Sequence, residues 1–207
     1  MSTAMIKLEI DGKTIEVAPG TMIIQAAELL DIYIPRYCYH KHLSIAANCR
    51  MCLVEVENVG KPLPACATPV ASDMKVMTQS PKALEAQRAV MEFLLINHPL
   101  DCPVCDQGGM CELQDSAMGY GSSHSYFEEG KLSTRSENIG PLIETWMTRC
   151  IKCTRCVRFG DEIAGVRELG VVNRGQHAEI STYVKKFVDS ELSGNIIDIC
   201  PVGALTD

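Results

Sequence analysis

The stretch CIKCTRC, residues 150–156, places three cysteines within seven residues. Three thiolates on one short loop suit a four-iron cluster, whose iron corners lie close enough together to be reached from one segment. The bacterial ferredoxin motif begins in the same way and ends in a nearby Cys-Pro, but here Phe159 and Gly160 follow, and Cys200-Pro201 would supply the fourth ligand from a distance. A single zinc ion rarely takes three ligands from so short a run. The spacing favours a four-iron cluster on set C, which comprises Cys150, Cys153, Cys156 and Cys200.

A second group, set A, has a close pair of cysteines between two distant ones and comprises Cys38, Cys49, Cys52 and Cys66. Plant-type two-iron ferredoxins use a related plan, with one cysteine before a close pair and a remote fourth. The small residues Ala46 and Ala47 would let the loop approach a cluster closely. The alternative is a structural zinc ion, which prefers two paired knuckles. Because Cys38 and Cys66 have no close partner in sequence, the spacing favours a two-iron cluster.

The remaining group, set B, comprises His98, Cys102, Cys105 and Cys111. Its three cysteines leave a four-coordinate centre one ligand short, and His98 lies just upstream. The alternative for His98 is a helix-terminal histidine favoured by the helix dipole. With His98, the eleven cysteines of the chain complete three four-ligand sites with none left over, so we expect it to be a ligand. Gly108 and Gly109 would let the backbone approach a cluster without a Cβ in the way.

The composition excludes several classes of function. The 207 residues carry a formal net charge of −7 and 5% aromatic residues, without a Lys/Arg stripe, so nucleic acid is not an expected partner. No apolar run approaches the roughly 20 residues that span a bilayer, and the amino terminus carries no secretory signal. An odd number of cysteines argues against a complete disulfide framework. Nucleotide-binding glycine motifs and nucleophile–base motifs are absent, which is typical of an electron carrier rather than an organic-substrate site.

The hydrophobic pattern predicts an α+β chain. Residues 5–10 and 14–17 alternate apolar and polar around Asp11-Gly12, which indicates a β-hairpin. Thr21 is the expected cap of a helix running from Ile23 to Leu30, and Ser80 the expected cap of a second helix that begins at Pro81 and stops before Pro99. The other expected elements are strands at 53–57, 63–68 and 178–184, a loop-rich stretch from 98 to 137 with an exposed turn at 119–123, and a helix at 158–169.

Other candidate residues carry weaker signals. We expect four histidines outside set B to be solvated rather than ligating; they are His40, His42, His124 and His177. Three basic residues, Lys152, Arg155 and Arg158, surround set C. They could offset the negative charge of a cluster or dock a partner, or they could form a solvated positive face.

Four stretches together resemble one protein family. They are NCRMCLVEV at 48–56, NHPLDCPVCDQGG at 97–109, MTRC through CVRF at 147–159, and SELSGN through CPVGAL at 190–205. These stretches are similar to the large iron–sulfur subunit of respiratory complex I, which is called NuoG in bacteria and the 75-kDa subunit in mitochondria. The resemblance covers nearly the whole chain.

The resemblance implies three cluster-binding domains. Residues 1–78 would form a ferredoxin-like β-grasp domain with one [2Fe-2S] cluster on set A. Residues 79–120 would form a domain with one histidine and three cysteine ligands that holds a [4Fe-4S] cluster on set B. Residues 121–207 would form a ferredoxin-like domain with a [4Fe-4S] cluster on set C. Both four-iron domains would be small, loop-rich and helical.

The resemblance also implies partners. In the family, a neighbouring subunit binds FMN and oxidises NADH, and electrons then pass through set A, set C and set B toward quinone, which other subunits bind. We therefore expect the flavin subunit and other peripheral-arm subunits as partners. We expect a peripheral location on the cytoplasmic side of the bacterial inner membrane or on the mitochondrial matrix side, with the membrane reached only through the complex.

Two departures from the family pattern leave alternatives open. Met110 stands where the family commonly has an acidic residue, and the sequence stops at Asp207, where the family normally continues into a large domain. The chain is then either a fragment or a short form like the comparable subunit of NAD-reducing hydrogenases. The alternative functions are a diaphorase iron–sulfur subunit of such a hydrogenase or of a formate dehydrogenase, and a zinc-stabilised structural module.

Overall fold

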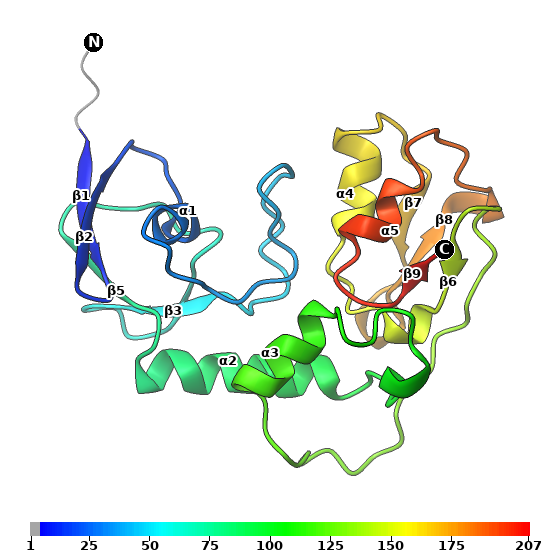
Figure 1. The fold of residues 1–207 in the computed structure, drawn as a ribbon, viewed down its shortest axis with the longest axis horizontal. Helices are drawn as coiled ribbons and strands as arrows, with labels where there is room; N and C mark the ends of the chain where they lie inside the picture. The colour runs from blue at the N-terminus through cyan, green and yellow to red at the C-terminus, as the bar shows by residue number, and fades with distance from the viewer. Residues whose placement is uncertain (1–4) are drawn as a thin grey trace. The chain divides into compact units, whose positions relative to one another are not determined.

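The computed structural model describes residues 5–207, and the chain divides into two compact units, each described separately below (Figure 1). The first unit comprises the chain up to Tyr39 together with Ile45–Met91. The second unit comprises His40–Ser44 and Glu92–Asp207. The expected division into three domains at residues 78 and 120 stays a prediction. Among residues 5–207, no helix has the length and apolar character needed to cross a lipid bilayer.

The first unit is built on a five-stranded sheet in the order β2-β1-β5-β3-β4. Strands β1 (Ile6–Ile10) and β2 (Lys13–Val17) form the expected antiparallel hairpin. Asp11 and Gly12 both have positive φ, of 48° and 80°, which an Asp-Gly turn of this type requires. The other strands are β3 (Leu53–Val56), β4 (Leu63–Pro64) and β5 (Met74–Met77), of which β5 runs parallel to β1 and antiparallel to β3.

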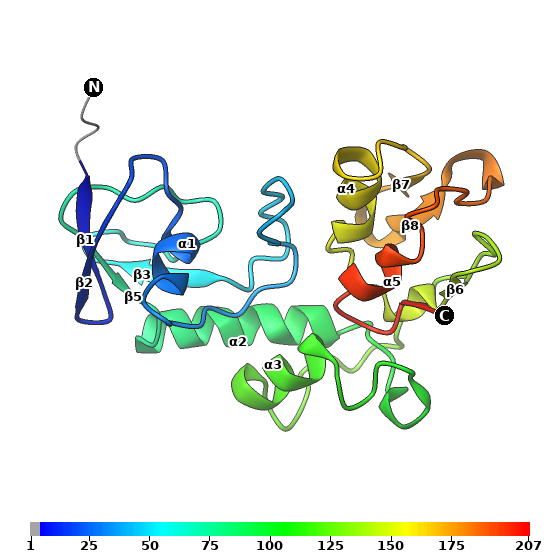
Figure 2. The same cartoon turned by 45° about the horizontal axis from the view of Figure 1, so that its top comes forward.

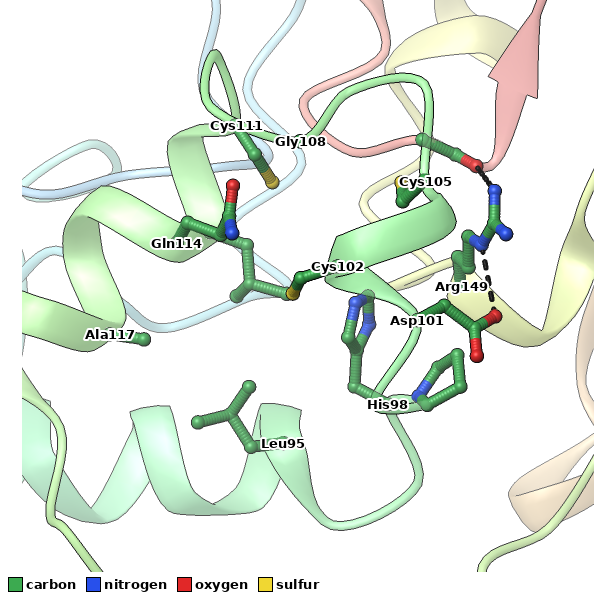
Figure 3. Close-up of a pocket in the computed structure, with 13 residues that line it drawn as sticks. Leu95, His98, Asp101, Cys102, Cys105, Gly108, Cys111, Gln114, Ala117 and Arg149 are labelled. Carbon is green, nitrogen blue, oxygen red and sulfur yellow. Dashed lines mark hydrogen bonds and ion pairs between the residues drawn. The ribbon is translucent and has the colours of Figure 1, made fainter.

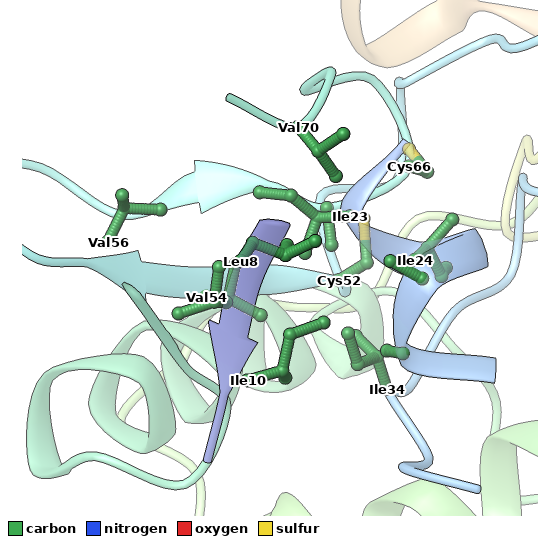
Figure 4. Packing of buried hydrophobic residues seen from close by; sticks show 14 of the residues in the cluster. Leu8, Ile10, Ile23, Ile24, Ile34, Cys52, Val54, Val56, Cys66 and Val70 are labelled. Carbon is green, nitrogen blue, oxygen red and sulfur yellow. The ribbon is translucent and has the colours of Figure 1, made fainter. Parts of the chain in front are cut away.

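Helix α1 (Ile23–Glu28) closes the core of this unit by packing against the sheet. Figure 4 shows Ile23 and Ile24 of this helix among the strand residues Leu8, Ile10 and Val54. Cys52 and Cys66 belong to the same buried cluster, so two members of set A are part of this core. The hydrophobic core therefore fixes the backbone from which these thiols extend.

Helix α2 (Pro81–Leu95) begins as the sequence predicts. The Ser80 hydroxyl oxygen accepts a hydrogen bond from the Ala83 N–H at 3.1 Å, which caps the first turn. The buried Gln87 side chain donates to the Leu53 carbonyl at 2.8 Å and ties the helix to β3. At the other end, the Lys131 ammonium donates to the carbonyls of Leu95 and Ile96, at 2.9 and 2.8 Å. These bonds give partners to carbonyl groups at the end of the helix.

The second unit has short elements joined by long loops. Its helices are α3 (Glu112–Tyr120), α4 (Arg155–Glu162) and α5 (Asn195–Ile199), with short 3₁₀ turns at Cys102–Val104, Met147–Arg149, Gly175–His177 and Tyr183–Lys185. Its two antiparallel pairs join β6 (Glu144–Thr145) to β9 (Leu205–Thr206), and β7 (Leu169–Val172) to β8 (Glu179–Thr182). Helix α5 contacts α4 and β9, and it lies beside α4 in both Figures 1 and 2. A buried cluster that includes Ile139, Phe159 and Ile196 forms its core.

Several expected elements differ from the structure in the first unit. Thr21 does not cap α1: its hydroxyl donates to the Ala18 carbonyl at 2.8 Å, and Met22 is the N-cap, with its N–H bonded to the Gln25 side chain. Helix α1 ends at Glu28, before Leu30. The strand expected at 63–68 stops at Pro64, because the chain turns there and the Thr68 hydroxyl donates back to the Pro64 carbonyl at 2.8 Å.

The second unit contains two further corrections. The stretch expected to be loop-rich contains α3, which includes Gly119 and Tyr120 of the expected turn. The acidic residues Glu112 and Asp115 in the first turn of α3 interact favourably with the helix dipole. The helix expected at 158–169 instead covers Arg155–Glu162. It ends there because Gly165 adopts a φ of +71° and the chain then enters β7.

The core of the first unit generates a stability prediction. Ile24→Ala removes a fully buried side chain (0% exposed) from α1 and should lower the free energy of unfolding of this unit by about 2–5 kcal/mol. Leu29→Ala, at the end of the same helix but 68% exposed, is the matched control and should change it by less than about 0.5 kcal/mol. Denaturant unfolding followed by circular dichroism measures both, and equal losses would contradict this packing.

Candidate functional site

Set A gathers its four thiols within the first unit. Cys38, Cys52 and Cys66 are buried and Cys49 is half-buried. Hydrogen bonds from the Cys49 and Cys66 side chains lower the pKa of Cys38, and a bond from Cys66 lowers the pKa of Cys52. Side-chain contacts therefore connect all four cysteines that the spacing groups together.

The loop between Cys38 and Cys52 also turns backbone N–H groups toward sulfur. The Cys38 N–H donates to the Cys49 sulfur at 3.4 Å, and backbone hydrogen bonds from Asn48 and Cys49 lower the pKa of Cys38. Ala47 and Arg50 adopt left-handed φ values of 51° and 61°, which fold the loop back on itself. Such N–H···S contacts stabilise thiolate, the form in which cysteine binds metal.

Set B surrounds a cavity in the second unit. The cavity has a volume of about 100 Å³ and is lined by His98 and the three cysteines, together with Leu95, Leu113, Ala117, Arg149 and Gly203. Figure 3 shows His98, Cys102, Cys105 and Cys111 arranged around it. His98 follows the end of α2, and Cys111 precedes α3. Cys102 is the first residue of a 3₁₀ turn, and Cys105 directly follows that turn. The structure thus brings together all four side chains of set B.

The His98 imidazole is suited to ligation. Burial, with smaller contributions from the nearby charges of Lys131 and Arg149 and against the opposing effect of Asp101, lowers the pKa of His98 to about 4. The ring is therefore neutral at pH 7 and can offer a nitrogen lone pair, which a protonated ring cannot. His98 does lie just beyond the end of α2, as the alternative of a helix-terminal histidine requires. Its imidazole nevertheless also lines the cavity of set B.

Two glycines permit the close packing of set B. A Cβ on Gly108 would lie 2.7 Å from the Cys102 carbonyl oxygen and 2.9 Å from that of Cys105. A Cβ on Gly203 would lie 2.3 Å from the Cys105 sulfur. Sequence reasoning selected Gly108 but missed Gly203, whose single signal is its position three residues after Cys200. The chain around Cys200 therefore packs directly on set B.

Two members of set C, Cys150 and Cys153, lie on a tight loop before α4, Cys156 lies in its first turn, and Cys200 directly follows α5. Lys152 and Thr154 have left-handed φ values of 56° and 62°, an uncommon conformation for residues with a Cβ, and these turns curl the Cys-x2-Cys-x2-Cys run. The Lys152 N–H donates to the Cys150 sulfur at 3.4 Å. All four cysteines line one apolar cavity of about 20 Å³, with Met147, Ile180, Pro201, Val202 and Leu205 among its other walls. Cys200, distant in sequence, thus lies beside the loop that carries Cys150 and Cys153.

Burial governs the protonation of set C. Burial raises the pKa of Cys150 to about 11 and that of Cys153 to about 12, and it also raises the pKa values of Cys156 and Cys200. These thiols are protonated at pH 7 unless a positive charge stabilises the thiolate. Metal binding supplies such a charge and releases the protons.

Two ion pairs connect the loops of sets B and C. The Arg149 Nε donates to Asp101 Oδ2 at 3.2 Å, and Arg155 binds both carboxylate oxygens of Glu112 at 3.0 and 3.2 Å. The sulfur of Cys111 lies 3.8 Å from the Pro201 carbonyl oxygen. Arg155 is buried, so of the alternatives left open by the sequence, a solvated positive face does not apply to this residue.

The remaining histidines keep other contacts. The rings of His40 and His42 lie 5.6 Å apart, and the ring of His124 meets Tyr126 edge-on at 4.8 Å.

Within residues 5–207, no three His, Cys, Asp or Glu side chains are arranged to hold one metal ion. A cluster of several irons takes its ligands around its outside and needs a wider arrangement than a single zinc ion, whose ligands lie about 2.0–2.3 Å away.

Three protein families match the chain in succession. The family described as a 2Fe-2S iron-sulfur cluster binding domain matches residues 3–81. The NADH-ubiquinone oxidoreductase-G iron-sulfur binding region matches residues 87–125, and the NADH-quinone oxidoreductase subunit 3 ferredoxin-like domain matches residues 140–206. The chain therefore contains [2Fe-2S] and [4Fe-4S] binding domains.

Curated relatives match nearly the whole chain. The NADH-ubiquinone oxidoreductase 75 kDa subunit of Reclinomonas americana is 58% identical over 98% of this chain and 29% of its own length. The G subunit of the NADH-quinone oxidoreductase of Rickettsia bellii is 55% identical over 97% of this chain and 30% of its own length. The chain thus spans about three-tenths of the length of these relatives.

A solved structure also matches. It is a chain of an NAD+-reducing [NiFe]-hydrogenase in the H2-reduced state, with a TM-score of 0.87 and 28% identity, covering 98% of this chain and 87% of that one. This chain therefore shares its fold with a chain of that hydrogenase, whereas its sequence is much more similar to the oxidoreductase subunits. By its matched families and its sequence identity, the chain is a relative of the NuoG and 75-kDa iron–sulfur subunits of NADH-quinone oxidoreductase.

Proposed function

We propose that this chain is the electron-transfer region of a proton-translocating NADH-quinone oxidoreductase. It relays electrons from a flavin subunit that oxidises NADH toward quinone. The observation that carries the proposal is 55–58% identity over nearly the whole chain to subunits of such enzymes. Partner subunits of the complex bind NADH, FMN and quinone. This chain itself lies peripheral to the membrane, on the cytoplasmic side of the bacterial inner membrane or on the mitochondrial matrix side.

Each set of ligands is assigned one cluster in this proposal. Set A holds one [2Fe-2S] cluster in a β-grasp domain, and sets B and C each hold one [4Fe-4S] cluster in small helical domains. The gathering of four thiols in set A supports its assignment, as do the cavities lined by all four members of set B and set C. Residues 1–78, 79–120 and 121–207 are the corresponding domains.

The clusters supply one-electron chemistry when bound, and the chain supplies their surroundings. In set B, Leu95, Leu113 and Ala117 present apolar surface to the cavity and exclude water. Burial keeps the His98 imidazole neutral. In set C, the Lys152 N–H aims at sulfur and stabilises thiolate. No proton transfer or organic substrate binding is assigned to these residues.

The structural match favours one second candidate, the iron–sulfur diaphorase subunit of an NAD-reducing hydrogenase. Its 28% identity, against 58% for the 75-kDa relative, places it behind the first proposal. Disruption of the gene distinguishes the two. We expect membranes of the mutant to lose NADH-dependent quinone reduction, whereas loss of hydrogen-dependent NAD+ reduction instead would favour the hydrogenase.

The iron content tests the cluster assignment directly. The anaerobically purified chain should contain about ten irons and equivalent acid-labile sulfide, the sum of one two-iron and two four-iron clusters. Electron paramagnetic resonance (EPR) of the reduced chain should show separable two-iron and four-iron signals. Zinc without sulfide would overturn the electron-transfer proposal and support a structural module.

Replacement of His98 tests the fourth ligand of set B. His98→Ala should lower the iron content from about ten to about six and remove one four-iron signal. His98→Cys should retain the cluster at a lower reduction potential, because a thiolate adds one negative charge. His124→Ala, at an exposed histidine, is the control and should retain all the iron. Full iron content and unchanged spectra in His98→Ala would remove His98 from the ligands.

The close approach of Gly203 to Cys105 generates a further prediction. Gly203→Ala places a methyl group 2.3 Å from the Cys105 sulfur and should displace that ligand, with loss of about four irons. Gly194→Ala is the control because its added Cβ meets nothing within 4 Å. Iron analysis and EPR distinguish the two variants. Equal retention of iron would show that the cluster of set B does not require the close contact between Gly203 and Cys105.

A further inference from the structure

Arg149 is a buried cation at the wall of the set B cavity. The residue is 3% exposed, and its side chain lines that cavity together with His98 and the three cysteines. Its Nε donates to Asp101 at 3.2 Å and its Nη1 donates to the Gly203 carbonyl at 3.4 Å, and both bonds are dashed in Figure 3. Its guanidinium carbon lies 4.6 Å from the centroid of the Trp146 ring. The surrounding contacts thus hold a full positive charge in a fixed place.

The contacts of Arg149 reach both four-ligand sets. Arg149 directly precedes Cys150 of set C, and its partner Asp101 directly precedes Cys102 of set B. Its second partner, Gly203, packs against the Cys105 sulfur. The guanidinium therefore holds the segment after Cys200 against set B, while its charge faces the set B cavity and not the cavity of set C.

The second ion pair of this unit has a different geometry. Arg155 meets Glu112 through two nitrogens and two oxygens, so its charge is matched bidentately. Arg149 meets its carboxylate through one nitrogen, Nε, at 3.2 Å, and its Nη1 donates to the Gly203 carbonyl instead. The field of Arg149 at set B is therefore less fully cancelled than the field of Arg155.

We propose that Arg149 is a positioning residue that raises the reduction potential of the group held by set B, with Asp101 partly opposing it. The inference rests on the proposed function. A reduced cluster carries one more negative charge than the oxidised cluster, so a fixed cation at the cavity wall stabilises the reduced form. Arg149 thereby biases electrons toward set B rather than set C.

The test is an EPR-monitored redox titration of the purified, cluster-loaded chain carrying single substitutions. Arg149→Gln should make reduction of the set B cluster at least tenfold less favourable, a lowering of 59 mV for one electron. Arg149→Lys keeps the charge and should restore most of the potential. Asp101→Asn removes the opposing carboxylate and should shift the midpoint in the opposite direction, upward.

The control is a matched ion pair at the surface. Arg167 binds Asp161 at 2.5 Å, and its side chain is 82% exposed, so Arg167→Gln should leave every midpoint unchanged. The two-iron midpoint should also stay unchanged in all variants. If Arg149→Gln loses the cluster, the upward shift in Asp101→Asn and the near-normal midpoint in Arg149→Lys still carry the test.

The outcomes separate this inference from the function on which it rests. Full cluster signals with unchanged midpoints, or shifts of the same sign in Arg149→Gln and Asp101→Asn, would overturn the role of Arg149 alone. An unmodified chain that gives no four-iron signal would overturn the proposed function and this inference together.

Discussion

Burial of sulfur is the constraint on which the second unit depends. Burial raises the pKa of Cys150 to about 11 and that of Cys153 to about 12, so these thiols favour the protonated form within the folded chain. A bound metal must remove those protons, which couples loading of the site to solution pH and to folding. The apolar walls that disfavour a free thiolate also exclude water from a bound cluster. In the proposed function, burial of the thiols therefore serves both the assembly of a cluster and electron transfer.

The two units support their cysteine sets with different amounts of regular secondary structure. The first unit has a five-stranded sheet and a helix whose shared core includes Cys52 and Cys66, so its backbone is well supported beside set A. The second unit has two-stranded pairs and short helices, and its ligands lie on loops and helix ends. Ion pairs such as Arg155–Glu112 supply connections there that a larger sheet would otherwise provide.

The charged side chains beside the cysteine sets are a second feature of the structure. The chain carries a net charge of −7, and in the proposed function clusters bound by thiolates would add negative charge to its interior. Buried arginines beside the ligands compensate part of that charge, and a carboxylate next to each arginine limits the compensation. The balance between cation and carboxylate then differs from one set to another. Such differences can set an order of potentials without any change of ligand.

The spacing of cysteines determined the three sets, because ligands of one cluster fall largely on short loops and leave a local pattern. The hairpin at Asp11-Gly12 and the start of α2 at Pro81 were predictable for the same reason: each depends on neighbouring residues. Helix α3 was missed because its residues form no strong apolar period, and its inner face is defined by the set B cavity.

The tertiary structure alone decided how the sets are joined. Arg149 meets Asp101 across 48 residues, Arg155 meets Glu112 across 43, and Gly203 packs on Cys105. No local pattern marks these pairs, since each partner has an ordinary sequence neighbourhood and only folding brings the two together. Sequence thus determined which side chains are the candidate ligands, and the fold determined which charges and close contacts surround them, because electrostatic fields and steric contacts act through space rather than along the chain.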